Sequence, residues 1–258
     1  MTTPSFIKIL ASRRMLVALV MGFASGLPLL LTLYVLQAWM KEEGVDLTVI
    51  GLMALVGLPY TLKFLWAPVL DRYTIPLFGR RRGWLLIAQT ALMLAIIGLS
   101  ATNPAQSPWM VALAAFWVTF FSASQDIVID AYRREDLADE ELGLGSSLYI
   151  NGYRTSMLLA SGGGLIMADH IPFSMVYLIM AACLLPGILT TLLTPEPDTP
   201  KGTPQTLQEA IVQPFVEYFS RPEAIWVLAF ILFYKIGDAM ASTMTTPFYL
   251  DIAFSKTE

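Results

Sequence analysis

The chain has 258 residues, of which 56% are hydrophobic and 14% charged, with a formal net charge of −4 and a mean hydropathy of +0.63. That is too little polar surface to cover a soluble globule of this length, so the composition predicts a membrane protein. The single cysteine and the single histidine exclude a disulfide framework, a cysteine or histidine metal centre and a histidine-based catalytic triad, and the mild acidity argues against nucleic acid as a partner.

Apolar segments long enough to cross about 30 Å of hydrocarbon, at about 1.5 Å per residue, recur along the chain. We expect membrane-spanning helices near Met15–Trp39, Leu47–Leu70, Trp84–Ala101, Pro108–Asp130, Gly145–Ala168, Phe173–Leu193 and Ala224–Leu250. The first segment is too long for a signal-peptide core and lacks a cleavage site of small residues, so we expect it to be retained. Gly22 and Gly26 in the first span, and Gly162–Gly164 in the fifth, would let helix backbones approach closely. The sequence therefore predicts an all-α integral membrane fold, with a six-helix bundle over residues 15–193 and one further helix over residues 224–250.

Basic residues concentrate in the segments before the first span and after the second, fourth and sixth spans, whereas the opposite segments hold only Lys41 and Lys256. The concentrated set is Lys8, Arg13, Arg14, Arg72, Arg80, Arg81, Arg82, Arg133, Arg134, Lys201 and Arg221. The positive-inside rule then places the N-terminal residues 1–14 in the cytoplasm and residues 251–258 on the periplasmic side.

A longer polar connection, residues 194–223, separates the sixth and seventh spans. Thr206 to Glu209 has the form of a capping box, and the following residues form a one-sided apolar stripe on the helix it would start, namely Ile211, Val212, Phe215, Val216 and Phe219. This helix lies either along the cytoplasmic membrane face or in solution as an ordinary linker. Because the seventh span has no second bundle to join, we expect the chain to be a truncated form of a longer transporter.

The connection after the second span carries the best short motif of the sequence. It has the form Ala67-x-x-x-Asp71-Arg72, followed by Gly79-Arg80-Arg81. This resembles the cytoplasmic loop signature of the major facilitator superfamily, in which an acidic residue and nearby arginines latch a gate. The resemblance implies that Asp71, Arg72, Gly79, Arg80 and Arg81 belong to such a gate, although Ala67 replaces the usual glycine and Thr74–Phe78 is an insertion. Alternatively, the arginines only fix topology and touch anionic headgroups.

Ionisable residues inside apolar spans are the strongest functional signal, because a charge in hydrocarbon costs roughly 2.5–3.5 kcal/mol and therefore usually faces a wet cavity or a partner. Ser122, Asp126 and Asp130 are spaced by four and share one stripe of the fourth helix. Desolvation favours the protonated form of a carboxylic acid, as a proton-coupled carrier requires, so Asp126 is our first candidate for proton coupling. Asp130 either contributes to this charge relay or forms a helix-end ion pair with Arg133 or Arg134.

Three more charges fall near mid-span. Arg154 would pair with an acid on a facing helix, Asp126 being the nearest candidate, and would either hold that pair permanently or exchange it for a substrate carboxylate. Lys235 and Asp238 share a face of the seventh helix and either neutralise each other or take part in coupling. Lys63 lies toward the end of its span, where it can snorkel, and we expect it to be structural.

Polar and aromatic residues within the spans supply substrate-binding candidates, namely Gln37, Gln125, Asn151 and Tyr153. Their amides could bond hydroxyl and acetamido groups. Trp39, Tyr149 or Tyr153 could stack on a sugar ring, although tryptophan and tyrosine also collect at membrane interfaces for other reasons.

Several longer motifs resemble the AmpG-type muropeptide permeases. They are Gly22-Phe23-Ala24-Ser25-Gly26-Leu27-Pro28, Leu36 to Met40, Lys63 to Pro68, Asp71 to Tyr73, the Gly79 to Trp84 run, Ser122 to Val128 with Asp130-Ala131, Gly152 to Arg154, and Tyr234 to Ala239. The resemblance covers about residues 15–250. It implies a proton-driven carrier in the inner membrane of a Gram-negative bacterium that imports N-acetylglucosaminyl-1,6-anhydro-N-acetylmuramyl peptides for peptidoglycan recycling, with no cofactor. It also implies a remaining C-terminal bundle as partner.

Alternatives of other kinds stay open. Acetyl-coenzyme A transporters share part of the Gln125-Asp126-Ile127 pattern, so the substrate could be a different one. A short form of this kind could also be a non-transporting membrane scaffold. An enzyme is not predicted, because the sequence holds no HExxH, G-x-S-x-G or phosphate-binding glycine loop.

Overall fold

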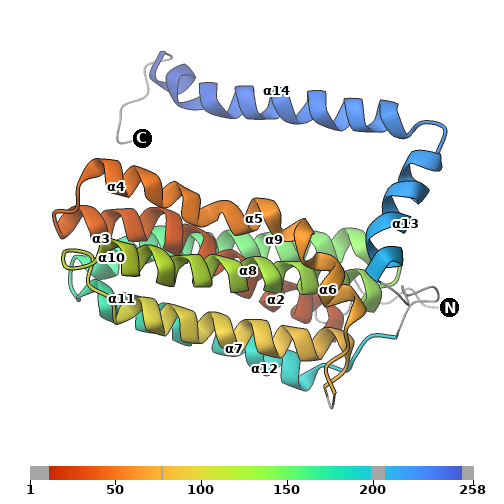
Figure 1. Ribbon diagram of the computed structural model, residues 1–258, viewed down its shortest axis with the longest axis horizontal. Coiled ribbons are helices and arrows are strands. Elements are labelled where there is room, and N and C mark those ends of the chain that lie inside the picture. The colour runs from red at the N-terminus through yellow and green to blue at the C-terminus, as the bar shows by residue number, and fades with distance from the viewer. Residues whose placement is uncertain (1–11, 77, 199–206, 252–258) are drawn as a thin grey trace. The chain divides into compact units, whose positions relative to one another are not determined.

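The computed structural model describes residues 12–76, 78–198 and 207–251, and it divides into two units, residues 1–204 and 205–258. Long helices dominate the described residues (Figure 1). Five of them are long and apolar enough to cross a membrane: Arg13–Glu42, Leu47–Leu65, Arg80–Ser100, Pro108–Asp136 and Phe173–Leu193. The predicted all-α membrane fold is confirmed.

Several of these helices are built from shorter pieces. The first consists of α2 (Arg13–Leu30), a π-helical turn (Leu31–Val35) and α3 (Leu36–Glu42). The second consists of α4 (Leu47–Leu52) and α5 (Leu58–Leu62), each followed by a 3₁₀ turn, and leads into α6 (Ala67–Arg72). Then follow α7 (Arg80–Ser100), α8 (Pro108–Asp136), α9 (Leu142–Leu158), a π-helical turn (Leu159–Gly163), α10 (Gly164–Ala168), α11 (Phe173–Ala182) and α12 (Leu185–Leu193).

The helix predicted near Gly145–Ala168 forms as α9, the π turn and α10, yet it is not among the five apolar helices named above. It carries Asn151, Arg154 and Thr155 on exposed positions, which lowers its hydropathy. Its length is still sufficient to cross about 30 Å of hydrocarbon. A helix of this composition is typical of one that faces a wet cavity on one side.

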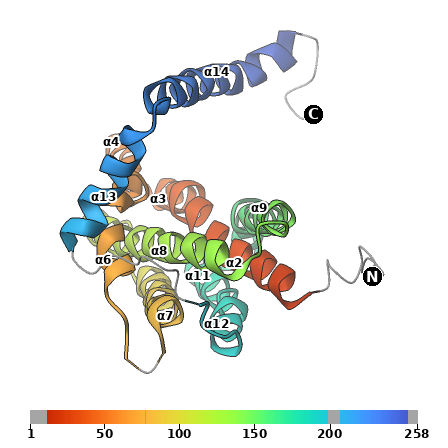
Figure 2. The ribbon, with the colours of Figure 1, turned by 90° about the vertical axis from the view of Figure 1, so that its right-hand side faces the viewer.

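Helix α2 lies among α8, α9 and α12, as the end-on view in Figure 2 shows. Its contact with α9 is unusually close, because a Cβ at Gly22 would collide with the carbonyl oxygen of Tyr149, and one at Gly152 with that of Leu19. The expectation for Gly22 and Gly26 is thus confirmed. The expectation for Gly162 is wrong, since a Cβ there would meet nothing within 4 Å.

A proline inside α2 determines how this helix is held by its neighbours. Pro28 has no N–H, so the carbonyl of Ala24, four residues earlier, cannot receive its usual helical hydrogen bond. Gln125 on α8 donates its Nε2 to that carbonyl at 3.1 Å. Two turns after Ala24, the hydroxyl of Tyr177 on α11 donates to the carbonyl of Leu31, where the π turn begins, at 3.1 Å. Side chains from two other helices therefore fix the irregular part of α2.

The ends of the bundle are closed by local turns. Asp46 caps α4 by accepting the backbone N–H of Thr48 at 2.8 Å, and this bond lowers the pKa of the Asp46 carboxyl. The insertion between α6 and α7 folds back through an isolated bridge between Ile75 and Gly79, where Gly79 has a φ of 88° that favours glycine.

The second unit holds α13 (Leu207–Ser220) and α14 (Ala224–Asp251). Helix α13 runs through Pro214 and exposes Phe215, Val216 and Phe219 of the predicted apolar stripe. Thr206 of the predicted capping box lies outside the described residues. In α14 the described apolar segment is Ala224–Gly237. Whether α13 lies on a membrane stays a prediction.

Candidate functional site

Asp126 on α8 is the centre of a buried polar cluster. Its side chain is buried against α2, with only 7% of the residue exposed, and it accepts a hydrogen bond from the hydroxyl of Ser25, which is 1% exposed. The Oγ of Ser25 also lies 2.8 Å from the hydroxyl of Tyr149 on α9. Three helices thus supply a carboxylate and two hydroxyls in one continuous chain.

Further ionisable groups surround this carboxylate. Lys63, in the 3₁₀ turn before α6, attracts it electrostatically, and Asp130 repels it. On another side lie the hydroxyls of Tyr60 and Ser122, which are near each other and buried, but neither has a partner with hydrogen-bond geometry. The expected structural role of Lys63 stays a prediction, with its charge close enough to Asp126 to attract it. We call the set Ser25, Tyr60, Lys63, Ser122, Asp126 and Tyr149 the Asp126 cluster.

The predicted pair between Arg154 and Asp126 does not form. Arg154 is exposed on α9, and no described carboxylate lies within ion-pair distance of it. It lines a cavity of about 690 Å³ together with Leu30 of α2 and with Tyr149, Ile150, Tyr153 and Met157 of α9. A cavity of this size suits a small-molecule ligand, and its one cation would attract an anionic group.

The substrate-binding candidates separate into three kinds. Tyr153 lines the cavity with Arg154, and Asn151 is exposed on α9, although its Nδ2 donates to the Ser147 carbonyl at 2.9 Å. Gln37 is half-buried on α3. Gln125 is fully buried, and its Nε2 donates to the Ala24 carbonyl that Pro28 leaves without a helical partner; its substrate contact stays a prediction. Trp39 is likewise buried, stacked on Phe173 with ring centroids 5.9 Å apart.

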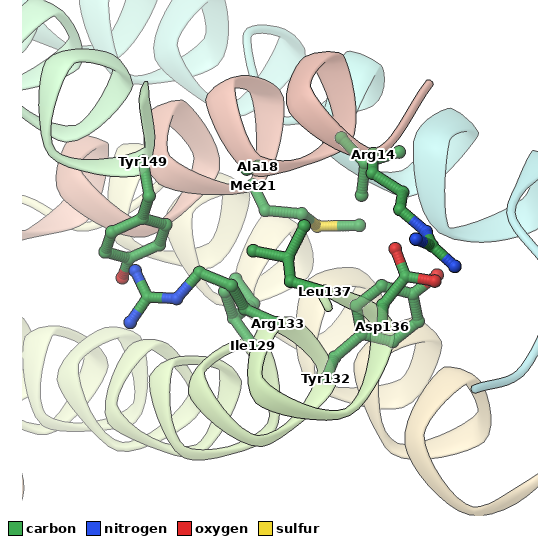
Figure 3. A pocket seen from close by; sticks show the side chains of 10 residues that line it. Arg14, Ala18, Met21, Ile129, Tyr132, Arg133, Asp136, Leu137 and Tyr149 are labelled. Carbon is green, nitrogen blue, oxygen red and sulfur yellow. The ribbon is translucent and has the colours of Figure 1, made fainter. Parts of the chain in front are cut away.

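The far side of the Tyr149 ring is covered by a cation. The guanidinium carbon of Arg133 lies 4.3 Å from the ring centroid, and Figure 3 shows the two side chains next to each other. Arg133 also pairs with Asp130 at 3.2 Å, which confirms the expected helix-end ion pair. Arg134 instead pairs with Asp139 at 3.0 Å. The small cavity beside these residues, about 10 Å³, leaves little open space between α2 and α8 at this end.

The predicted gate residues lie together at the same end of the bundle as Arg133. Arg81 on α7 is 6% exposed in its side chain and joins two carboxylates, Asp71 at 2.6 Å and Glu135 at 2.7 Å. Glu135, at the end of α8, also accepts Arg80 at 2.8 Å. Arg72 makes no described ion pair, and its guanidinium lies 5.9 Å from the Tyr73 ring. We call Asp71, Arg80, Arg81 and Glu135 the Arg81 cluster.

A second acid ties this cluster to the segment after α12. Glu196 accepts the backbone N–H groups of Arg81 and Arg82 at 2.7 and 2.9 Å, so it caps the N-terminus of α7, where negative charge is favoured. Its side chain occupies the place where a Cβ at Gly79 would sit. The Arg82 guanidinium in turn donates to the last carbonyls of α12, those of Thr191 and Leu192. The side chains of Arg80, Arg81 and Arg82 are therefore all held by hydrogen bonds or ion pairs within the bundle.

The charged pair predicted on the seventh helix is only partly described. Lys235 is exposed on α14, whereas the side chain of Asp238 lies outside the described part of the structure. Their pairing stays a prediction.

Sequence reasoning missed Ser25, Tyr60, Glu135 and Glu196. The periodicity of α8 could have revealed Glu135, because it follows the buried Val128 by seven positions and so shares its face.

A comparison with protein-family models identifies the family of this chain. The model of the Major Facilitator Superfamily matches residues 14–256. The chain belongs to the major facilitator superfamily. This membership makes it a multi-pass membrane protein of a transporter family, in agreement with the apolar helices.

Individual facilitator-superfamily relatives are similar over nearly the whole chain. The Anhydromuropeptide permease of Escherichia coli (strain K12) is 46% identical over 247 residues, which cover 95% of this chain and 50% of that protein. An uncharacterized protein of Haemophilus influenzae is 43% identical over 250 residues, covering 95% and 59%. Putative transporter AmpG 4 of Rickettsia felis is 29% identical over 263 residues, covering 97% and 63%. The chain thus spans about half to two-thirds of the length of these relatives.

Proposed function

We propose that this chain forms the first bundle and the seventh helix of a proton-driven permease that imports anhydro-muropeptides across the inner membrane of a Gram-negative bacterium. The similarity to a protein named Anhydromuropeptide permease supports the substrate. The buried Asp126, linked through Ser25 to Tyr149 at the edge of a large cavity, supports proton coupling. The end that carries Arg14, Arg81 and Arg133 faces the cytoplasm, with the N-terminus, in line with the positive-inside rule. The chain has no catalytic role.

Asp126 is the main observation behind this proposal. Burying a carboxylic acid inside a membrane bundle costs free energy, so such a residue is usually kept for a function. Protonation neutralises Asp126 and removes its attraction to Lys63. The change in this attraction would alter how the helix pieces before α6 hold to α8. The proton thereby biases the bundle between two arrangements, which is what coupling requires.

Arg154 and Tyr153 bind the substrate in this proposal. An exposed guanidinium in a cavity of about 690 Å³ can pair bidentately with a carboxylate of the stem peptide, while the Tyr153 ring offers a face to a sugar. Asn151 and Gln37 add polar contacts. A further helix bundle, such as the greater length of the relatives could supply, would cover this cavity from the other side.

The Arg81 cluster forms the cytoplasmic latch. Its ion pairs join α6, α7 and α8 at one end of the bundle, so they hold these helices together while the far ends move. Asp238 and Lys235 are a second coupling candidate on α14.

The test is uptake of labelled anhydro-muropeptide into proteoliposomes that contain the protein expressed from its complete native reading frame. An inward proton gradient should drive accumulation, and Asp126→Asn should abolish accumulation while substrate exchange continues. Arg134→Gln, in an exposed pair, serves as the matched control. Accumulation that survives Asp126→Asn would falsify coupling through this residue. Uptake of acetyl-coenzyme A in place of the muropeptide, or no transport at all by a correctly inserted protein, would refute the assigned substrate or the carrier role.

A further inference from the structure

We propose that Ser25 and Tyr149 form a hydroxyl relay that carries the proton between Asp126 and the water beside α9. The inference rests on the proposed coupling role of Asp126 and adds two residues whose function is to move its proton. It is carried by the chain of contacts Asp126, Ser25 and Tyr149 across three helices.

The direction of these hydrogen bonds follows from the number of protons available. The ionised Asp126 can only accept, so Ser25 donates its single hydroxyl proton to it. The Oγ of Ser25 is then free to accept from the Tyr149 hydroxyl, 2.8 Å away. All donors therefore point toward Asp126 when it is charged, and all point away from it when it is protonated.

Burial makes the relay necessary. Ser25 and Asp126 are 1% and 7% exposed, so bulk water has little access to the carboxylate. Tyr149 is only half-buried and lines both the large cavity beside α9 and the small cavity near Arg133. Tyr149 is thus the outermost hydroxyl of the chain and the place where protons can be exchanged with water.

The transfer balances in one concerted step. A hydronium ion gives its proton to the Tyr149 oxygen and is left as water, while the original phenol proton moves to Ser25 and the original serine proton moves to Asp126. One proton has then reached the carboxylate, both hydroxyls are restored, and no other bond has changed. Release of the proton is the same step in reverse.

Neighbouring groups favour this path over others. The positive charge of Lys63 attracts the Asp126 carboxylate, and the negative charge of Asp130 repels it. The hydroxyls of Tyr60 and Tyr153 are also close enough to interact electrostatically with this carboxylate. Among the described residues, the path through Ser25 is continuously hydrogen-bonded, whereas Tyr60 and Ser122 have no hydrogen-bond partner. The Arg133 guanidinium, 4.3 Å from the Tyr149 ring centroid, holds that ring in place.

The experiment compares proton-driven uptake with substrate exchange in proteoliposomes, using the protein from its complete reading frame and a pH-sensitive dye inside the vesicles. Ser25→Ala and Tyr149→Phe each remove one hydroxyl from the relay, and loss of one hydrogen bond should slow substrate-driven proton entry by on the order of tenfold. Substrate exchange, which needs no net proton movement, should fall much less.

Two matched controls remove hydroxyls outside the relay. Ser156→Ala deletes a buried serine hydroxyl that bonds the Tyr153 carbonyl of its own helix, and Tyr177→Phe deletes a buried phenol that bonds Leu31. Both should keep the wild-type ratio of proton-driven uptake to exchange. A relay variant with this same ratio would overturn the relay.

The relay and the proposed function fail in different ways. If Asp126→Asn leaves proton-driven uptake intact, coupling through Asp126 is wrong. If Asp126→Asn abolishes it but Tyr149→Phe does not reduce it, the relay alone is wrong. Should Ser25→Ala not fold, Tyr149→Phe decides, because phenylalanine keeps the ring that packs on Arg133.

Discussion

Replacement of Glu135 by glutamine tests the structural core of the latch. The Glu135 carboxylate, 9% exposed in its side chain, accepts from Arg80 at 2.8 Å and from Arg81 at 2.7 Å. Glutamine preserves the volume and one acceptor oxygen, but it removes the negative charge and turns an NH₂ group toward two guanidinium groups. Both arginines are about as buried as Glu135 itself, so water cannot replace the lost charge.

The geometry sets the expected size of the effect. Removing one partner of a buried ion pair costs about 3–5 kcal/mol. Asp71 remains 2.6 Å from Arg81 and compensates part of that loss, so we expect Glu135→Gln to lower the free energy of unfolding by about 2–3 kcal/mol. Asp139→Asn is the matched control. The side chains of Arg134 and Asp139 are 65% and 80% exposed, so their ion pair should contribute at most about 1 kcal/mol to the free energy of unfolding.

Reversible unfolding of the purified protein in mixed micelles, followed by circular dichroism, measures both values. Introducing Glu135→Gln into an Arg81→Gln background should cost clearly less than in the wild type, since the two residues share one interaction. Equal losses for Glu135→Gln and Asp139→Asn, or full additivity with Arg81→Gln, would refute the view that this pair is buried and coupled.

Three further predictions concern packing and binding. Gly152→Ala should lower the thermal midpoint strongly, because its Cβ would collide with the α2 backbone, whereas Gly98→Ala, with open space at its Cβ, should leave the midpoint equal or higher. Gln125→Met should cost about 1–3 kcal/mol of unfolding free energy by orphaning a buried carbonyl, with KM unchanged; a raised KM at unaltered stability would return Gln125 to the substrate site. Arg154→Gln should raise KM for substrates with a stem-peptide carboxylate by roughly tenfold or more, and an equal KM would remove Arg154 from the binding site.

The positions of the helices could be predicted from the sequence because hydrocarbon imposes length and apolarity on every span. The Arg81 cluster could be predicted in part, since Asp71 and Arg81 are close in the chain and their side chains meet at 2.6 Å. Glu135, the second carboxylate that pairs with Arg81, lies in a run of four charged residues. Only its spacing of seven from the buried Val128 distinguishes it within that run.

The partner of Asp126 could not be predicted, because spacing fixes faces within a helix but not which helix each face meets. Tyr149 and Arg154 are five positions apart on α9, or about 140° around the axis, so their side chains leave the helix in different directions although both border the same cavity. The structure turns Tyr149 toward Ser25 and leaves Arg154 at the cavity. The register between α2 and α9, which small residues on both helices set, determines that Tyr149 rather than Arg154 lies next to Ser25.

That register has a mechanical consequence. Where Gly22 and Gly152 bring two main chains into direct contact, no flexible group stands between α2 and α9 that could absorb a displacement. In the carrier proposed above, α2 and α9 would therefore move as one rigid unit that carries both Ser25 and Tyr149. Water would then gain access to the Asp126 carboxylate through elements that move relative to α2 and α9. The candidates are α8 and the pieces of helix that carry Tyr60 and Lys63.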